Sequence, residues 1–138
     1  MQVTYHDADL PTTADLIDLY DSVGWSAYTC EPDRLHAAVA RSLRVVTARV
    51  GEQLVGLARV VGDGLTIIYL QDVLVRPERQ RSGIGRELTN RVLEGFEDVR
   101  QKVLLTDDEP DQRAFHTAMG FNEVGSPEYP GLAFVRFS

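Results

Sequence analysis

The sequence contains one cysteine, Cys30, in 138 residues, so no disulfide can form within the chain. It also contains no apolar run that approaches the roughly 18 residues of a transmembrane helix. The N-terminus has no basic region followed by an apolar stretch, which is the pattern of a signal peptide. From these absences we expect a reduced, cytoplasmic protein with no membrane segment.

An excess of positive charge is likewise missing. The chain has 14 Lys and Arg against 21 Asp and Glu, a formal net charge of -7. Nucleic acid is therefore disfavoured as a partner, because phosphate-backbone binding needs a basic face. No metal site is expected. The length and the ordinary composition, 43% hydrophobic and 25% charged, predict one globular domain over residues 1–138.

Hydrophobic periodicity predicts the elements of the fold. Helical spacing is found at residues 14–23, from Pro32 onward, and at residues 83–94 and 111–119. Runs typical of strands are residues 2–7, 43–50, 54–61, 65–75, 103–106, 121–124 and 132–137. Turn signals, among them Asp63-Gly64, join the three central strands into an antiparallel meander. We expect an α/β (α+β) fold in the order β-α-α-β-β-β-α-β-α-β-β, a mixed, mostly antiparallel sheet with helices on both faces.

The segment with the clearest chemistry joins the long strand to the following helix, and it reads Gln80-Arg81-Ser82-Gly83-Ile84-Gly85. Glycines allow a ligand to approach the backbone, and the free N–H groups of a first helical turn attract phosphate. Four of the 14 basic residues fall within eleven positions here: Arg76, Arg79, Arg81 and Arg86. The segment therefore predicts an anion site, although two glycines alone also fit a plain tight turn.

Two nucleotide-binding motifs can be compared with this segment. A dinucleotide fingerprint needs a third glycine where Leu88 stands, and it follows the first strand of a βαβ unit, not a meander. A P-loop ends in Gly-Lys-Ser or Gly-Lys-Thr, whereas this chain has Gly85-Arg86-Glu87. Neither motif is satisfied.

Residues 75–88, Val-Arg-Pro-Glu-Arg-Gln-Arg-Ser-Gly-Ile-Gly-Arg-Glu-Leu, resemble the acetyl-CoA signature of the GNAT N-acetyltransferase superfamily. A second block, residues 114–121, Ala-Phe-His-Thr-Ala-Met-Gly-Phe, is similar to that family's Phe-Tyr-x-x-x-Gly-Phe segment. The order and spacing of the two blocks also fit. The resemblance implies an N-acetyltransferase domain that uses acetyl-CoA as cosubstrate.

The resemblance also implies which residues hold coenzyme A. Main-chain groups of Val73, Leu74 and Val75 would pair with the pantetheine arm, although Val73 and Val75 also suit a plain core strand. Loop residues would bind the pyrophosphate through their backbone: Gln80, Arg81, Ser82, Gly83, Ile84, Gly85 and Arg86. Two departures from the family, Glu109 and Gln112 where Asn and Ala are usual, weaken the match around the second block.

For catalysis, the family uses direct attack of an amine on the thioester, so Cys30 is not needed as a nucleophile. The acid that protonates the leaving thiolate is often a Tyr, at the position that His116 occupies here. His116 is therefore either the acid or a surface residue. Asp72 and Tyr69 are candidates for the base, and a water chain is the alternative. Asp72 lies in an apolar strand, so it is either functional or firmly hydrogen-bonded.

The acceptor-binding residues are expected in two loops. Trp25 and Tyr28 could form an aromatic wall with cation–π attraction for an ammonium, or Trp25 could pack in the core. Glu128 and Tyr129 are candidates from the last hairpin, where exposed loop residues are the alternative. The acceptor could be an arylalkylamine, a polyamine, an amino sugar or a peptide amine, and the aromatic residues favour a small hydrophobic amine.

Two other hypotheses compete with that of an N-acetyltransferase. A non-catalytic acyl-CoA-binding or regulatory domain would keep the fold and lose the acid, as His116 suggests. A nucleotide-binding protein is the third hypothesis.

An exposed strand edge is compatible with a homodimer.

Overall fold

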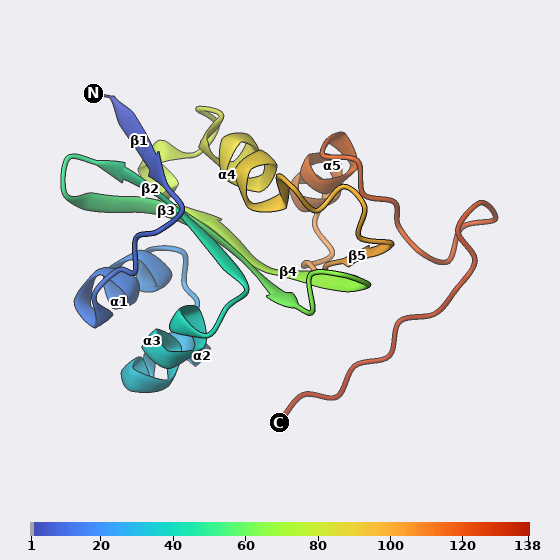
Figure 1. Cartoon of the computed structure of the whole chain (residues 1–138), viewed down its shortest axis with the longest axis horizontal. Helices are drawn as coiled ribbons and strands as arrows, with labels where there is room; N and C mark the ends of the chain where they lie inside the picture. The colour runs from blue at the N-terminus through green and yellow to red at the C-terminus, as the bar shows by residue number, and fades with distance from the viewer. Residues whose placement is uncertain (1) are drawn as a thin grey trace. The chain divides into compact units, whose positions relative to one another are not determined.

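The computed structural model describes residues 2–138, which divide into two compact units, residues up to Leu105 and residues 106–138. The units are described separately, and the predicted single domain stays a prediction. The first unit is a five-stranded sheet in the order β1-β2-β3-β4-β5 (Figure 1). Its strands are β1 (Val3–His6), β2 (Arg44–Val50), β3 (Gln53–Gly62), β4 (Ile67–Val75) and β5 (Gln101–Val103).

Pairing in the sheet is antiparallel from β1 to β4, and β5 runs parallel to β4. The expected meander and the mixed, mostly antiparallel sheet are therefore confirmed. The register of β3 and β4 shifts once, because Arg59 pairs with Asp72 whereas Val60 pairs with Leu70. This shift leaves Gln71 as an extra residue on β4, a β-bulge.

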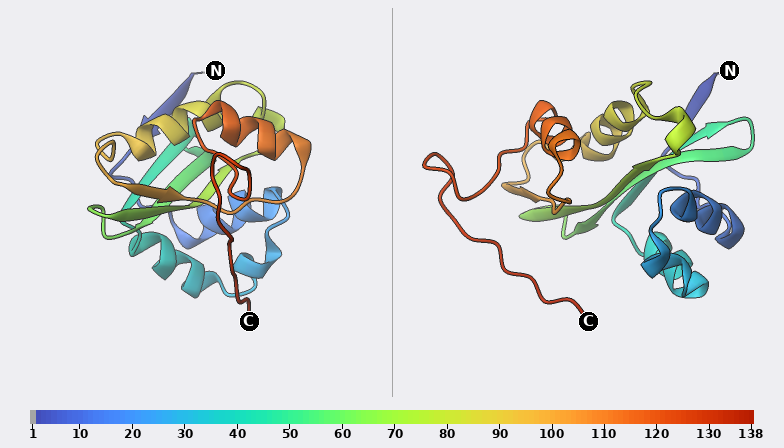
Figure 2. Two further views of the ribbon diagram at one scale, coloured as in Figure 1. Left: turned by 90° about the vertical axis from the view of Figure 1, so that its right-hand side faces the viewer. Right: turned by 180° about the vertical axis from the view of Figure 1, so that it is seen from behind.

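Helices cover both faces of the sheet in this unit (Figure 2). One face carries α1 (Thr13–Ser22), the single-turn α2 (Ser26–Thr29) and α3 (Pro32–Ala40), and the other carries α4 (Ile84–Leu93). Thr12 begins α1 by accepting a hydrogen bond from the Asp15 N–H at 3.1 Å. The expectation that Tyr28 lies in a loop is corrected, because it belongs to α2.

Two apolar layers hold the helices against the sheet. Beneath α1 and α3, a core cluster joins residues of both helices to β3 and β4: Leu16, Leu19, Tyr20, Leu35, Val39, Leu54, Leu57 and Leu74. On the other face, Ile84, Leu88 and Val92 of α4 are buried. Gly56 allows α4 to approach β3 closely, since a Cβ there would lie 2.9 Å from Leu88 Cδ1.

The second unit contains α5 (Pro110–Ala118), as predicted, but neither of the two strands expected after it. Residues 121–124 and 132–137 are not assigned to strands, and Leu132 and Phe134 are 81% and 87% exposed. A strand gains its backbone hydrogen bonds from a partner strand, and none is described within residues 106–138. The chain instead turns at residues 125–129, where the Gly125 N–H donates to the Tyr129 carbonyl at 2.8 Å.

Candidate acyl-transfer site

The edge of β4 is open along most of its length. Strand β5 pairs with only three β4 residues, Ile67 to Tyr69, and no other described strand pairs with this edge farther along. Residues 70–75 therefore keep one row of backbone groups without a strand partner. Val73, Leu74 and Val75, predicted to contact pantetheine, lie in this stretch. Such an edge can hydrogen-bond an extended ligand in the manner of an added strand.

The loop after β4 turns tightly into α4. It passes through a short 3-10 helix, η1 (Pro77–Arg79), and then Arg81 and Gly83 adopt left-handed conformations with φ of 65° and 89°. Two side chains brace the loop from within: Gln80 Nε2 donates to the Val75 carbonyl at 3.0 Å, and Ser82 Oγ donates to the Arg79 carbonyl at 2.5 Å. Of the predicted loop residues, Gln80 and Ser82 therefore use their side chains to hold its shape.

The first turn of α4 supplies the donors for an anion. The helical hydrogen bonds begin when the Glu87 N–H donates to the Gly83 carbonyl at 3.1 Å. The N–H groups of Ile84, Gly85 and Arg86 precede that bond, at the positive end of the helix dipole. A Cβ built on Gly83 would meet no heavy atom within 4 Å, so the backbone there borders open space. This geometry suits a phosphate or pyrophosphate.

Arg76 corrects one expectation about the loop. Its side chain is buried; Nε donates to the Leu54 carbonyl at 2.7 Å, and the guanidinium forms an ion pair with Asp18. The charge of Arg76 is thus neutralised by α1, and the residue anchors the end of β4 in place of enriching the anion site. Arg79 is half-buried, and Arg81 and Arg86 are exposed.

Asp72 lies in a buried hydrogen-bond network. The Tyr20 hydroxyl donates to Asp72 Oδ2 at 2.8 Å, and Arg59 Nε donates to the same oxygen at 2.5 Å. Burial, and then the charge of Asp72, raise the pKa of Tyr20 well above its usual value. Asp72 is therefore firmly hydrogen-bonded, and its catalytic role stays a prediction. Sequence reasoning missed Arg59, although a lone arginine in an apolar strand signals a buried partner.

Tyr28 and Gln71 extend this network outward. The Tyr28 hydroxyl lies 3.5 Å from Asp72 Oδ1, and Gln71 Nε2 donates to the Tyr28 hydroxyl at 2.9 Å. Burial is the main cause that raises the pKa of Tyr28, with the Asp72 charge next. Gln71 was not predicted, because its place in a bulge depends on strand register, which the sequence does not display.

Two further predicted site residues, Trp25 and Tyr69, lie in the first unit. Trp25 packs against the core cluster, with its ring centroid 5.9 Å from that of Tyr20 and 6.0 Å from that of Tyr28. It is half-buried, so it combines core packing with an exposed part. Tyr69 is also half-buried; burial is the main cause that raises its pKa, a backbone hydrogen bond with Leu105 opposes it, and the Asp72 charge adds to it.

His116 lies on α5 in the second unit, among aromatic rings. Its ring centroid is 5.1 Å from that of Phe115 and 6.3 Å from that of Phe121. Its Nδ1 is buried without a hydrogen-bond partner among the described residues. Burial lowers the pKa of His116, so the neutral imidazole is favoured. Glu128 and Tyr129 belong to the same unit and are exposed in its turn.

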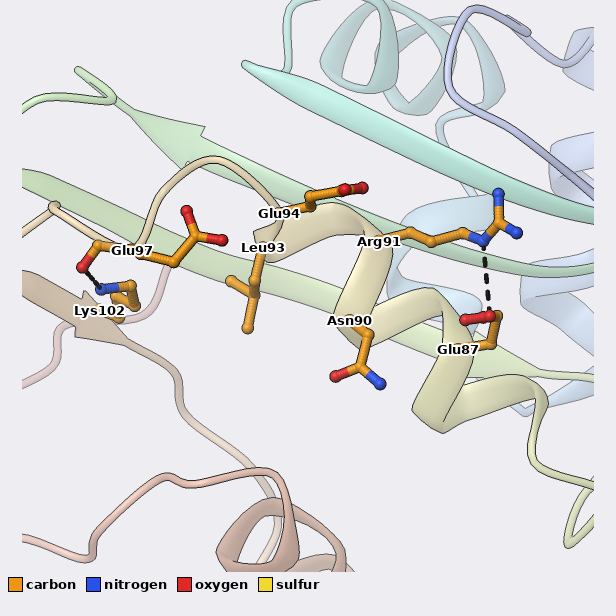
Figure 3. A pocket seen from close by; sticks show the side chains of 7 residues that line it. All are labelled: Glu87, Asn90, Arg91, Leu93, Glu94, Glu97 and Lys102. Atoms are coloured by element: carbon orange, nitrogen blue, oxygen red, sulfur yellow. Dashed lines mark hydrogen bonds and ion pairs between the residues drawn. The ribbon is translucent and has the colours of Figure 1, made fainter.

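The structure thus brings Trp25, Tyr28, Tyr69 and Asp72 into one unit, whereas His116, Glu128 and Tyr129 belong to the other. A separate hollow of about 650 Å³ involves none of these residues (Figure 3). Its walls come from α4, the segment that follows it and β5: Glu87, Asn90, Arg91, Leu93, Glu94, Glu97 and Lys102. Its charges are partly paired internally, as in the 3.7 Å contact of Arg91 Nε with Glu87 Oε1.

No group of three or more His, Cys, Asp or Glu among residues 2–138 is arranged to hold a metal ion. None of the described helices is both long enough and apolar enough to cross a membrane.

Comparison with known proteins gives one family. The family model described as an acetyltransferase (GNAT) domain matches residues 17–137. An uncharacterised N-acetyltransferase from Prochlorococcus marinus is 32% identical over 118 residues, which are 79% of this chain and 63% of that protein. A Gibberella zeae protein named as an acetyltransferase is 44% identical over 57 residues, 39% of this chain and 32% of that protein. The chain therefore spans less than two thirds of the length of these curated relatives.

Solved structures give the same fold. A GNAT family acetyltransferase from Streptococcus pneumoniae is 30% identical, with a TM-score of 0.83 over 99% of this chain and 100% of that one. The aminoglycoside N-acetyltransferase AAC(6')-Iy, solved with a bisubstrate analogue in which CoA is joined to acetylneamine, is 17% identical with a TM-score of 0.70. The match covers 100% of this chain and 99% of that one, and at 17% identity it shows a shared fold alone.

Proposed function

The chain belongs to the GNAT acetyltransferase family, and from this premise we propose that it transfers the acetyl group of acetyl-CoA to the nitrogen of a small primary amine. One observation carries the proposal: the open edge of β4 leads directly into a left-handed loop at the N-terminus of α4. Strand edge and helix terminus together suit a ligand that has an extended amide-containing arm and a pyrophosphate.

Coenzyme A binding would use mainly the backbone. Main-chain groups of Val73 to Val75 would pair with the amides of pantetheine, and the N–H groups of residues 81–86 would hold the pyrophosphate. The exposed guanidiniums of Arg81 and Arg86 would add positive charge near the phosphates. The supporting observations are the unpaired strand edge and the open space beside Gly83.

Acyl transfer requires a neutral amine, a stabilised oxyanion and a protonated leaving sulfur. Asp72 is poorly suited as the base, because Arg59 and the Tyr20 hydroxyl already bind its Oδ2. Tyr69 is a poor base as well, since its raised pKa keeps the phenol protonated. We propose that the ammonium proton leaves through water and that Asp72 orients Tyr28.

His116 is proposed to assist the departure of the thiolate. Its lowered pKa leaves little imidazolium at neutral pH, so it would act as a neutral N–H that donates a hydrogen bond to the leaving sulfur. The proton that the attacking nitrogen loses would reach the thiolate through water. The same observation favours a second candidate function, a non-catalytic acyl-CoA-binding domain, because a neutral imidazole is a weaker acid than the imidazolium form.

The two functions are separated by one experiment. The protein is incubated with acetyl-CoA and a panel of primary amines, free thiol is followed, and each amine is checked by mass for one added acetyl group. Amine-dependent thiol release with acetylated product is the result that we expect. Tight acetyl-CoA binding without release across the panel would favour the binding domain, and protection against heat by ATP or NAD in place of CoA would contradict both.

A further inference from the structure

Gln71 is held at the surface end of the buried network by the bulge in β4. In a regular strand, consecutive side chains point to opposite faces, yet Gln71 and Asp72 both reach the Tyr28 hydroxyl, at 2.9 Å and 3.5 Å. The shift in register opposite Arg59 and Val60 explains this. The bulge therefore adds one polar side chain to the face that already carries Asp72.

The orientation of the Gln71 amide follows from its one hydrogen bond. Nε2 donates to the Tyr28 hydroxyl, which fixes Oε1 on the other side of the amide. Among the described residues, none donates a hydrogen bond to Oε1. Since Gln71 is only half-buried, this acceptor is available to a ligand. The Tyr28 oxygen is the second acceptor, at the neighbouring position.

The charge around these acceptors limits what they can bind. Arg59 Nε lies 2.5 Å from Asp72 Oδ2, so the one carboxylate of the network is already neutralised. Tyr28 stays protonated because its pKa is raised, and the Gln71 amide is neutral. The network thus offers neutral oxygen acceptors without net negative charge, beside the half-buried rings of Tyr28 and Trp25. A polycation would need free carboxylates, whereas a monoamine needs only acceptors for its N–H groups.

We infer that Gln71 is the specificity-determining residue of the acceptor site, and that the acceptor is a primary monoamine with an apolar body. The inference rests on the proposed acetyl transfer. Gln71 Oε1 and the Tyr28 oxygen accept hydrogen bonds from the nitrogen of the amine, and the Trp25 and Tyr28 rings contact its apolar part. Asp72 acts through Tyr28 as a positioning residue.

The test compares 2-phenylethylamine, an apolar monoamine, with putrescine, a diamine, at saturating acetyl-CoA. The wild-type protein should have a kcat/KM for 2-phenylethylamine about tenfold or more above that for putrescine. Gln71→Met removes both polar atoms at similar volume and should raise the KM for 2-phenylethylamine about 5- to 50-fold, while the KM for acetyl-CoA stays within about twofold. Gln71→Glu adds a carboxylate and should shift the preference toward putrescine.

The matched control is Gln53→Met, the same change at the exposed start of β3. It should leave both KM values unchanged. An unchanged amine KM in Gln71→Met, an equal rise in Gln53→Met, or a wild-type preference for putrescine would overturn the inference. Tyr28→Phe keeps the ring and removes the hydroxyl; its effect should overlap with that of Gln71→Met, so the double variant should be no worse than the poorer single variant.

A binding measurement separates failure of this inference from failure of the proposed function. Trp25 is the only tryptophan in the chain, and its ring lies 6.0 Å from Tyr28. Its fluorescence should therefore change when 2-phenylethylamine binds in the presence of CoA. If no amine is acetylated, a fluorescence change with weaker binding in Gln71→Met would sustain the amine site and refute the transferase. No change in the wild-type protein would overturn the amine site itself.

Discussion

Arg59 and Asp72 form an ion pair between neighbouring strands of the sheet, with 2.5 Å between Arg59 Nε and Asp72 Oδ2. Both side chains are almost completely buried, at 6% and 1% exposure. Removing one partner leaves the other as an uncompensated buried charge, which costs far more than losing the pair as a unit.

We predict that Arg59→Met lowers the free energy of unfolding by about 3–5 kcal/mol, because the Asp72 charge loses its counter-ion. The double variant Arg59→Met with Asp72→Leu should recover most of that loss, since no buried charge remains. Urea denaturation of the three proteins measures both effects. A double variant less stable than Arg59→Met would contradict the account of the pair.

Gly56 gives a second prediction about stability. An alanine Cβ there would lie 2.9 Å from Leu88 Cδ1 and 3.1 Å from the Leu74 carbonyl oxygen, so α4 must move away from β3. Gly56→Ala should destabilise the protein by about 1–3 kcal/mol. Gly131→Ala is the control, because its Cβ would meet nothing within 4 Å. Equal melting temperatures for the two variants would show that α4 does not pack as described.

The protonation of His116 can be measured directly. Burial lowers its pKa below the usual histidine value of about 6.5, so the folded protein favours the neutral ring. The buried neutral ring of His116 therefore contributes to the free energy of unfolding above about pH 6.5, and this contribution is lost as the pH falls through the pKa of the folded state. Titration of the three histidines by NMR, with His116→Phe to assign the signal, should give His116 the lowered value. A His116 pKa at or above 6.5 would contradict its burial.

Turnover tests the proposed role of the same residue. His116→Phe removes the N–H that would donate to the leaving sulfur, so kcat should fall about tenfold or more while the affinity for acetyl-CoA is kept. His116→Tyr places the usual residue of the family at this position and should retain turnover. Wild-type kcat in His116→Phe would remove His116 from the mechanism.

Much of the first unit could be predicted from its sequence, because its elements have strong periodic patterns. The three strands from β2 to β4 and the helix α4 lie within a few residues of their predicted bounds. Residues 121–124 and 132–137 were predicted to be strands from apolar composition alone. Composition does not reveal whether a partner strand is available, and none is described in their unit.

The candidate site was predicted in part. The loop could be located from its glycines, because glycine tolerates the left-handed backbone that Gly83 adopts. The partners of charged side chains could not, because they depend on how strands and helices pack together. Arg76 is the clearest example. Its position in the sequence placed it among the basic residues of the predicted anion site, whereas its side chain pairs with Asp18 on α1. Gln71 was missed for the same kind of reason, since a bulge is a property of two paired strands.

Amine-dependent thiol release, measured at varied acetyl-CoA concentration, shows whether the loop at Gly83 binds acetyl-CoA for transfer to an amine. Gly83 and Gly95 flank α4 with nearly equal φ values of 89° and 87°, so leucine at either position introduces a similar backbone strain. We expect Gly83→Leu to raise the KM for acetyl-CoA about tenfold or more, a loss of about 1.4 kcal/mol or more, whereas Gly95→Leu should leave this KM unchanged. Equal KM values in the two variants, or no amine-dependent release from the wild-type protein, would contradict this role of the loop.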